Sequence, residues 1–176
     1  MTSNIQNSVP HSDDTSGRSV IDWTVRIRAN AHELNGSFSV LIFLDDVPDD
    51  PHLWKSSPSY VGGYSAFVSS TPDQQPALTQ GFTHLSNWIA EKTKLGSFDP
   101  GVVVPFLKDK LSWRVQMAGG VAVELTKVTS LEVTVLATPL TLEPGAVFPT
   151  PGETQFYPNI TAGRIGGSRS ERVSEE

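Results

Sequence analysis

The sequence contains no cysteine among its 176 residues. This absence excludes disulfide bonds, thiolate metal sites and a cysteine nucleophile. No apolar run approaches the roughly 20 residues that a membrane helix needs, so we expect no membrane partner. Residues 1–17 are polar and acidic and lack the apolar stretch of a secretory signal. Together with the missing cysteines, they predict a cytoplasmic protein.

Positive charge is also scarce. The formal net charge is −6 and the isoelectric point is about 5.1. Phosphate binding requires a basic surface, so we expect no nucleic-acid partner. The sequence has no Gly-x-Ser-x-Gly elbow, no Gly-x-Gly-x-x-Gly motif and no phosphate loop. We therefore predict no cofactor, and the sequence favours a non-enzymatic role without deciding the matter.

The chain predicts one folded domain with a polar tail at each end. Residues 1–19 and 165–176 contain few large apolar side chains, and burial cannot offset the entropy of ordering them. We therefore expect a disordered leader over 1–19, a single domain over 20–164 and a disordered tail over 165–176.

Strand patterns dominate the central region. Ile21–Ala29 alternates apolar and polar residues, which is typical of a half-buried strand, and Ser37–Leu44 becomes apolar on both faces, as in a central strand. Further strands are expected at Gly62–Ser69, Phe82–Leu85, Trp113–Met117, Val121–Leu125 and Leu131–Ala137, a loop at Asp45–Ser59, and a proline-rich extended arm at 139–158. Ser86 and Asp99-Pro100 read as helix starts. The fold class is mainly β, an antiparallel β-sandwich with one or two short helical insertions.

Several separated segments carry a family resemblance. They are Ser37–Leu44, Tyr60-Val61-Gly62, Gly81-Phe82, Ser97–Pro100, Trp113-Arg114-Val115, Ser130–Thr141 and Pro144-Gly145. In this order they resemble the C-terminal domain of fungal tyrosinases over about residues 20 to 167. The resemblance implies a β-sandwich laid over the mouth of a dinuclear copper site. The resemblance also implies that such a sandwich keeps the pro-enzyme latent until proteolysis removes the sandwich. One side chain of the sandwich then lies above the coppers as a substrate mimic.

The copper site itself is not expected in this chain. A tyrosinase needs six histidines, whereas this sequence has His11, His32, His52 and His84, with no pair at i, i+4 spacing. The chain is therefore not expected to be a copper oxidase by itself. The family's Cys-x-x-Cys pair, implicated in copper loading, is replaced by Gln75 and Leu78. Neither residue offers the thiolate or imidazole that copper prefers, so we expect copper delivery to be lost.

The resemblance places the substrate mimic on Gly63–Phe67, with Phe67 or Tyr64 as the side chain. An aromatic residue on a strand is more often part of the core. Trp54, in the proline-rich loop, could instead line a pocket. We take Tyr60, Tyr64, Phe67 and Trp54 as the candidate surface for a partner or ligand.

Two other groups of polar residues are candidates for chemistry. Asp45, Asp46, Asp49 and Asp50 could bind Mg²⁺ or Ca²⁺ through oxygens, although a solvated loop is the simpler interpretation. Asp22, Asp50, His52 and His84 are the candidates for acid–base work, and no spacing in the sequence brings them together.

Two function classes remain open. One is a freestanding interaction module that shields a partner protein, for which a tyrosinase-type copper oxidase is the candidate. The alternative is a repurposed domain that binds or transforms a small hydrophobic molecule. A homodimer is a further expectation, and an excised tail of a longer enzyme is a third explanation of the chain.

Overall fold

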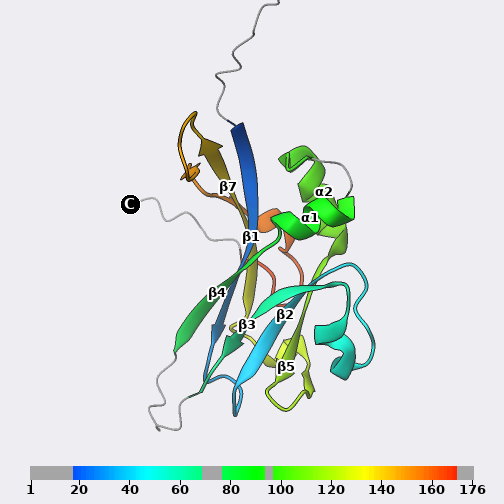
Figure 1. Cartoon of the computed structure of the whole chain (residues 1–176). Coiled ribbons are helices and arrows are strands. Elements are labelled where there is room, and N and C mark those ends of the chain that lie inside the picture. The colour runs from blue at the N-terminus through cyan, green and yellow to red at the C-terminus, as the bar shows by residue number, and fades with distance from the viewer. Residues whose placement is uncertain (1–17, 69–76, 94–96, 170–176) are drawn as a thin grey trace, which may run out of the picture.

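The computed structural model describes residues 18–68, 77–93 and 97–169 as two antiparallel sheets packed face to face (Figure 1). One sheet has the order β4-β1-β7-β8, with β9 also paired to β7, and the other has the order β3-β2-β5-β6. The first sheet comprises β1 (Arg18–Asn30), β4 (Leu78–His84), β7 (Glu132–Leu142), β8 (Thr150–Pro151) and β9 (Gln155–Tyr157); the second comprises β2 (Phe38–Leu44), β3 (Tyr60–Ala66), β5 (Leu111–Met117) and β6 (Ala122–Val123). The predicted β-sandwich is confirmed.

β1 forms because its side chains alternate between the core and the outer face of the sheet. Trp23, Val25 and Ile27 are fully buried, whereas the intervening residues keep part of their surface exposed. The strand begins at Arg18, which pairs with Leu142. It therefore starts two residues before the domain boundary predicted at residue 20.

β2 is buried on both faces, as the sequence predicted for a central strand. Val40 and Ile42 join the main core between the sheets. Leu41 and Phe43 point the other way and pack with Trp54 in a second, smaller cluster. Trp54 belongs to the short 3-10 helix η1 (Pro51–Ser56), so the predicted loop after β2 contains a helix that covers the outer face of this sheet.

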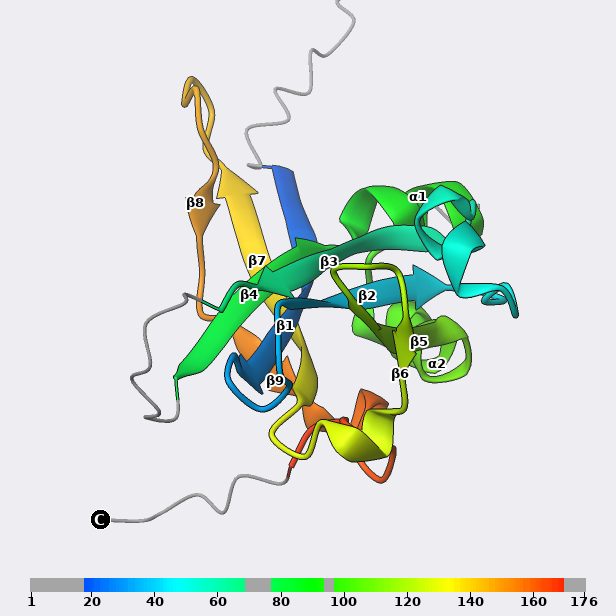
Figure 2. The ribbon, with the colours of Figure 1, turned by 90° about the horizontal axis from the view of Figure 1, so that it is seen from below.

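Helices α1 (Ser86–Thr93) and α2 (Pro100–Lys110) lie together along one side of the sandwich (Figures 1 and 2). They contribute the fully buried Ile89, Val103 and Leu107 to the main core. Asp99 caps α2 as predicted, accepting a hydrogen bond from the Gly101 N–H at 2.8 Å. No helix within the described ranges is long and apolar enough to cross a membrane.

The proline-rich arm predicted at 139–158 is paired in part. β7 continues to Leu142, and β8 and β9 fold back onto it. After η3 (Pro158–Ile160), the buried Thr161 hydroxyl donates to the Val133 carbonyl at 2.7 Å, and Gly167 bridges to Val133. The folded structure thus extends through residue 169, past the boundary predicted at 164, because backbone groups of this segment complete the edge of β7.

Candidate functional site

Phe67 is a large aromatic side chain held out into solvent. It directly follows β3, and 81% of its surface is exposed. Its backbone neighbours are fixed on both sides, since Ala66 pairs with Phe38 and the Val68 N–H donates to the Ser37 hydroxyl at 3.1 Å. An exposed ring on an anchored backbone can meet another surface with little loss of backbone entropy.

Tyr64, the other residue predicted as the substrate mimic, is partly buried against the core. Its ring covers Gly81 of β4 so closely that a Cβ atom at Gly81 would lie 2.1 Å from the ring. Tyr64 therefore packs β3 against β4, whereas Phe67 has no such packing role.

Tyr60 and Trp54 belong to a different surface from Phe67. Their rings pack around Phe43, with centroid distances of 5.8 Å and 6.4 Å respectively. Trp54 is 5% exposed, and its indole N–H donates to the Pro48 carbonyl at 2.7 Å. Burial raises the pKa of the Tyr60 hydroxyl. Since β3 separates Tyr60 from Phe67 by roughly 20 Å at about 3.3 Å per residue, the four predicted residues do not form one site.

The acidic loop after β2 does not gather its carboxylates. Asp45 pairs with Lys110 at 3.4 Å, and Asp50 caps η1 by accepting from the His52 N–H at 2.9 Å. The hydrogen bond that the Lys110 ammonium donates to Asp45 raises the pKa of Lys110. Over residues 18–68, 77–93 and 97–169, no three histidine, aspartate or glutamate side chains lie close enough to hold a metal ion. Of the two residues at the family's cysteine positions, Leu78 begins β4 with its side chain exposed, and Gln75 lies outside the described residues.

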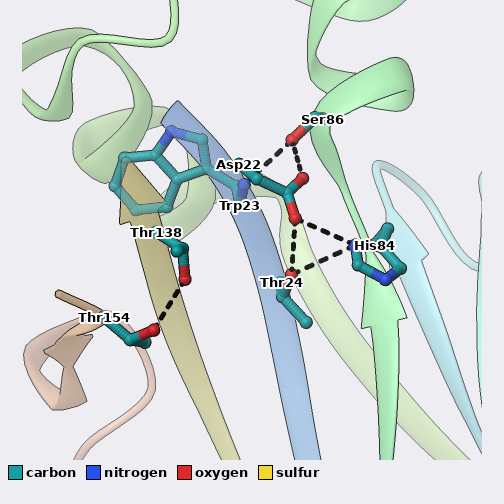
Figure 3. A network of polar contacts seen from close by, with 7 residues as sticks. All are labelled: Asp22, Trp23, Thr24, His84, Ser86, Thr138 and Thr154. Atoms are coloured by element: carbon teal, nitrogen blue, oxygen red, sulfur yellow. Dashed lines mark hydrogen bonds and ion pairs between the residues drawn. The ribbon is translucent and has the colours of Figure 1, made fainter. Parts of the chain in front are cut away.

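The structure brings together two acid–base candidates that the sequence left apart. The register of β1 against β4 places Thr24 opposite His84, and the Asp22 Oδ2 atom lies 3.1 Å from His84 Nδ1 (Figure 3). Ser86 donates to Asp22 Oδ1 at 2.7 Å and accepts from the Trp23 N–H at 2.8 Å. The predicted helix start at Ser86 is confirmed, but the capping role implied for its side chain was wrong, because the hydroxyl is directed to β1 and the Leu85 carbonyl receives the first helical bond from Ile89.

This network pins the start of α1 to β1 and lacks the geometry of a nucleophilic triad. Ser86 donates its proton to Asp22, and His84 contacts the other oxygen of the same carboxylate, so the imidazole is not placed as the base for the Ser86 hydroxyl (Figure 3). The His84 side chain is 74% exposed, so it lies at the protein surface. Asp50 and His52 lie apart from it on η1.

Comparison with known proteins agrees with the family resemblance. The family model of the tyrosinase C-terminal domain matches residues 22–135. A tyrosinase of Neurospora crassa is 28% identical over 162 residues, which is 85% of this chain and 24% of the relative. Polyphenol oxidase 2 of Agaricus bisporus is 32% identical over 142 residues, 76% of this chain and 24% of the relative. The chain thus spans about a quarter of the length of the curated relatives it matches.

Solved structures give the same result at the level of the fold. A mushroom tyrosinase crystallised in its latent and active forms together superposes with a TM-score of 0.66 at 28% identity, over 86% of this chain and 28% of that one. A recombinant mushroom tyrosinase gives a TM-score of 0.62 at 26% identity, over 84% of this chain and 26% of that one. The chain therefore belongs to the tyrosinase C-terminal domain family.

Proposed function

We propose that this domain is a shielding module that covers a tyrosinase-type copper oxidase, with Phe67 as the side chain that enters the partner's active-site mouth. The observation that carries the proposal is the exposure of Phe67 on a backbone held at Ala66 and Val68. Aromatic side chains of this kind supply a large share of the contact energy in protein interfaces. Similarity to a mushroom tyrosinase that has a latent form supports the same proposal.

The surroundings of Phe67 suit a docking surface. Ala66 pairs with Phe38, and the Ala77 carbonyl accepts from Ala31, so both lie at the end of the sandwich where β1 turns into β2. Leu78, which follows Ala77, is 58% exposed. This end therefore carries two exposed apolar side chains, one just after β3 and one at the start of β4, and the Tyr64–Gly81 contact packs these two strands together.

The test is inhibition in trans. A fungal tyrosinase lacking its own C-terminal domain is mixed with this chain, and the rate of monophenol oxidation is measured. We expect saturable inhibition at a 1:1 ratio. Phe67→Ala should raise the half-inhibitory concentration at least ten-fold, because the variant lacks the entering ring. Its free energy of unfolding should change by less than about 0.5 kcal/mol, as at other exposed positions.

Phe148 offers a matched control. It is 80% exposed, equal to Phe67 within a percentage point, but lies between β7 and β8. Phe148→Ala should leave inhibition unchanged. Equal loss in both variants, or no inhibition by an excess of the parent chain, would contradict the proposal. Sedimentation of the chain alone shows whether a second copy covers Phe67 instead.

The alternative function, binding of a small hydrophobic molecule at the Phe67 surface, predicts a different result. Phe67→Ala would then abolish ligand binding without any effect on an oxidase. The high exposure of the Phe67 ring favours contact with a protein surface over enclosure of a ligand.

A further inference from the structure

A groove lies beside the edge of β5, next to η2 (Leu125–Lys127) and the segment that follows η3. β6 pairs with β5 only at Val115 and Gln116, so this edge is only partly covered. The groove has a volume of about 550 Å³, within the range typical of small-molecule sites. Its apolar walls are formed by Trp54, Val123, Leu125 and Ile165.

Two arginines meet at one end of this groove. Arg114 borders both the groove and an adjoining hollow, and Arg164 borders the hollow. The Arg164 guanidinium lies 4.3 Å from the centroid of the Trp113 ring, and Arg114 donates to the Trp113 carbonyl at 2.8 Å. Burial, followed by the charge of Arg114, lowers the pKa of Arg164. The two arginines therefore border the same hollow, with Arg164 lying over the Trp113 ring.

No carboxylate neutralises this pair within the described part of the chain. The ion pairs found there involve Arg26, His84 and Lys110, and neither Arg114 nor Arg164 is among them. The chain carries a net charge of −6, so acidic groups are abundant elsewhere. Guanidinium groups bind carboxylates in a planar, two-point geometry, and an added carboxylate would supply the missing countercharge.

The other part of the groove has the opposite charge. Glu124 lines the groove but not the adjoining hollow that Arg164 borders. A ligand with one anionic group can place it between the arginines and extend its apolar body along the walls. A ligand with a second anionic group would bring that group towards Glu124, where like charges repel.

We propose that this groove binds an organic monocarboxylate. Arg114 and Arg164 hold the carboxylate, and Trp54, Leu125 and Ile165 contact an aromatic or aliphatic body. The site contains neither Phe67 nor Leu78, so it is independent of the shielding role proposed above.

The test uses 3-phenylpropanoate and its neutral counterpart 3-phenylpropanamide. Isothermal titration of the full chain should show the acid binding at least ten-fold more tightly than the amide, because only the acid pairs with the arginines. In ¹H–¹⁵N NMR spectra, the acid should shift the indole signal of Trp113, identified by its loss in Trp113→Phe.

Substitutions assign the charge selection to the two arginines. Arg164→Gln and, separately, Arg114→Gln should bring the affinity for the acid to within two-fold of that for the amide. The Arg114 variant keeps the test valid if loss of the Arg164 stack on Trp113 unfolds the chain. Lys127→Gln is the matched control, because it removes one positive charge from η2 at a residue that lines neither the groove nor the adjoining hollow. It should change the affinity for the acid less than two-fold.

Glu124→Gln tests whether Glu124 repels a second anionic group of a ligand in the groove. It should strengthen binding of 1,4-phenylenediacetate, a dicarboxylate, at least three-fold while leaving 3-phenylpropanoate within two-fold.

Three results with the full-length chain would overturn the proposal. They are equal affinities for acid and amide in the parent, an equal loss of acid binding in Lys127→Gln, and binding of an acidic peptide with none of 3-phenylpropanoate. A chain ending at residue 169 should bind the acid as the full chain does. Much tighter binding by the shortened chain would assign the groove to the chain's own Glu171, Glu175 and Glu176 instead.

Discussion

Gly81 leaves the space on β4 that the Tyr64 ring occupies. A Cβ atom there would lie 2.1 Å from the ring and 2.8 Å from the Tyr64 Cβ, so the near end of the side chain would have to move. Gly81→Ala should therefore lower the free energy of unfolding by about 1–3 kcal/mol, as overpacking does. Urea denaturation measures this change.

Gly119 provides the comparison, because a Cβ atom there meets nothing within 4 Å. Gly119→Ala should stay within about 0.5 kcal/mol of the parent. Adding Tyr64→Ala to Gly81→Ala should cost less than the sum of the two single changes, since the clash then disappears. Equal effects of Gly81→Ala and Gly119→Ala would show that the ring moves freely.

Glu33 ties the β1–β2 turn to the segment before β7. Burial raises its pKa, and hydrogen bonds from Ser130 and Thr129 lower it, with a net shift below 4.5. Because the folded pKa is lower than the unfolded one, the stabilisation is complete above about pH 4.5 and is lost as the pH falls through the folded pKa. Glu33→Gln should cost about 1 kcal/mol at pH 7, less than the about 1.5–3 kcal/mol of a fully buried charged hydrogen bond, because solvent screens this partly exposed carboxylate.

The pH dependence distinguishes this interaction from a general charge effect. Stability of the parent and of Glu33→Gln, measured by urea denaturation, should converge as the pH falls from 5 towards 3. Glu153→Gln, at an exposed glutamate, should follow the parent throughout. A difference between the parent and the Glu33 variant that persists unchanged at pH 3 would contradict the prediction.

At the scale of elements, the segment after η3 supplies acceptors to buried donors. The Trp113 indole N–H donates to the Ile165 carbonyl at 3.1 Å, and the Val133 N–H donates to the Gly166 carbonyl at 2.9 Å. A chain ending at residue 164 should be less stable than one ending at 169 by at least about 2 kcal/mol, since each unsatisfied buried donor costs about 1–3 kcal/mol. Thermal and urea unfolding of the two chains test this.

Ile165→Ala in the longer chain is the control for this truncation. It keeps the backbone carbonyl and removes only an exposed side chain, so it should cost less than about 1 kcal/mol. If it costs as much as the truncation, side-chain packing and not the backbone acceptors stabilises the segment.

The elements differ in how far the sequence predicts them. The alternation of Trp23, Val25 and Ile27 is enough to predict β1, and the apolar faces of β2 predict a central strand, because both patterns are local. The pairing of Asp22 with His84 depends on the register of strands about 60 residues apart, which no local pattern contains. The wrong role for Ser86 has the same origin: a distant carboxylate competes for its hydroxyl.

The candidate site was predictable only in part. The resemblance singled out Phe67, whose exposure fits a contact role, but it could not separate Phe67 from Tyr64. That distinction depends on Gly81, a residue on another strand. The arginine groove was missed because Arg114 and Arg164 are 50 residues apart, and no local pattern of the sequence indicates that they border one hollow.

At the scale of the molecule, one core connects all the larger elements. It contains Trp23 and Val133 from one sheet, Ile42 from the other, and Ile89 and Leu107 from the helices. We therefore expect unfolding to be a single transition, with superimposable curves from tryptophan fluorescence and far-ultraviolet circular dichroism. Fluorescence that changes at lower urea than the circular dichroism would indicate a separately melting unit, with Trp54 and its small cluster as the first candidate.

The whole chain should also lack oxidase activity of its own. It has four histidines, and among the described residues no group suited to a metal ion is formed. After incubation with copper and removal of the excess, we expect no stoichiometric copper by metal analysis and no oxidation of monophenols or catechols. Two bound coppers per chain would contradict this prediction, and an intact fungal tyrosinase treated in parallel is the positive control.

The position of β1 in its sheet affects how the protein is made. Its neighbours β4 and β7 both come later in the chain, and the pairing with β7 extends to Leu142. At about 5–20 residues per second, a ribosome needs roughly 6–20 seconds to add the residues between the end of β1 and the end of β7. During this time β1 has an open edge that can pair with other nascent chains. Expression at low temperature or with a chaperone should therefore raise the soluble yield more than changes to the finished surface would.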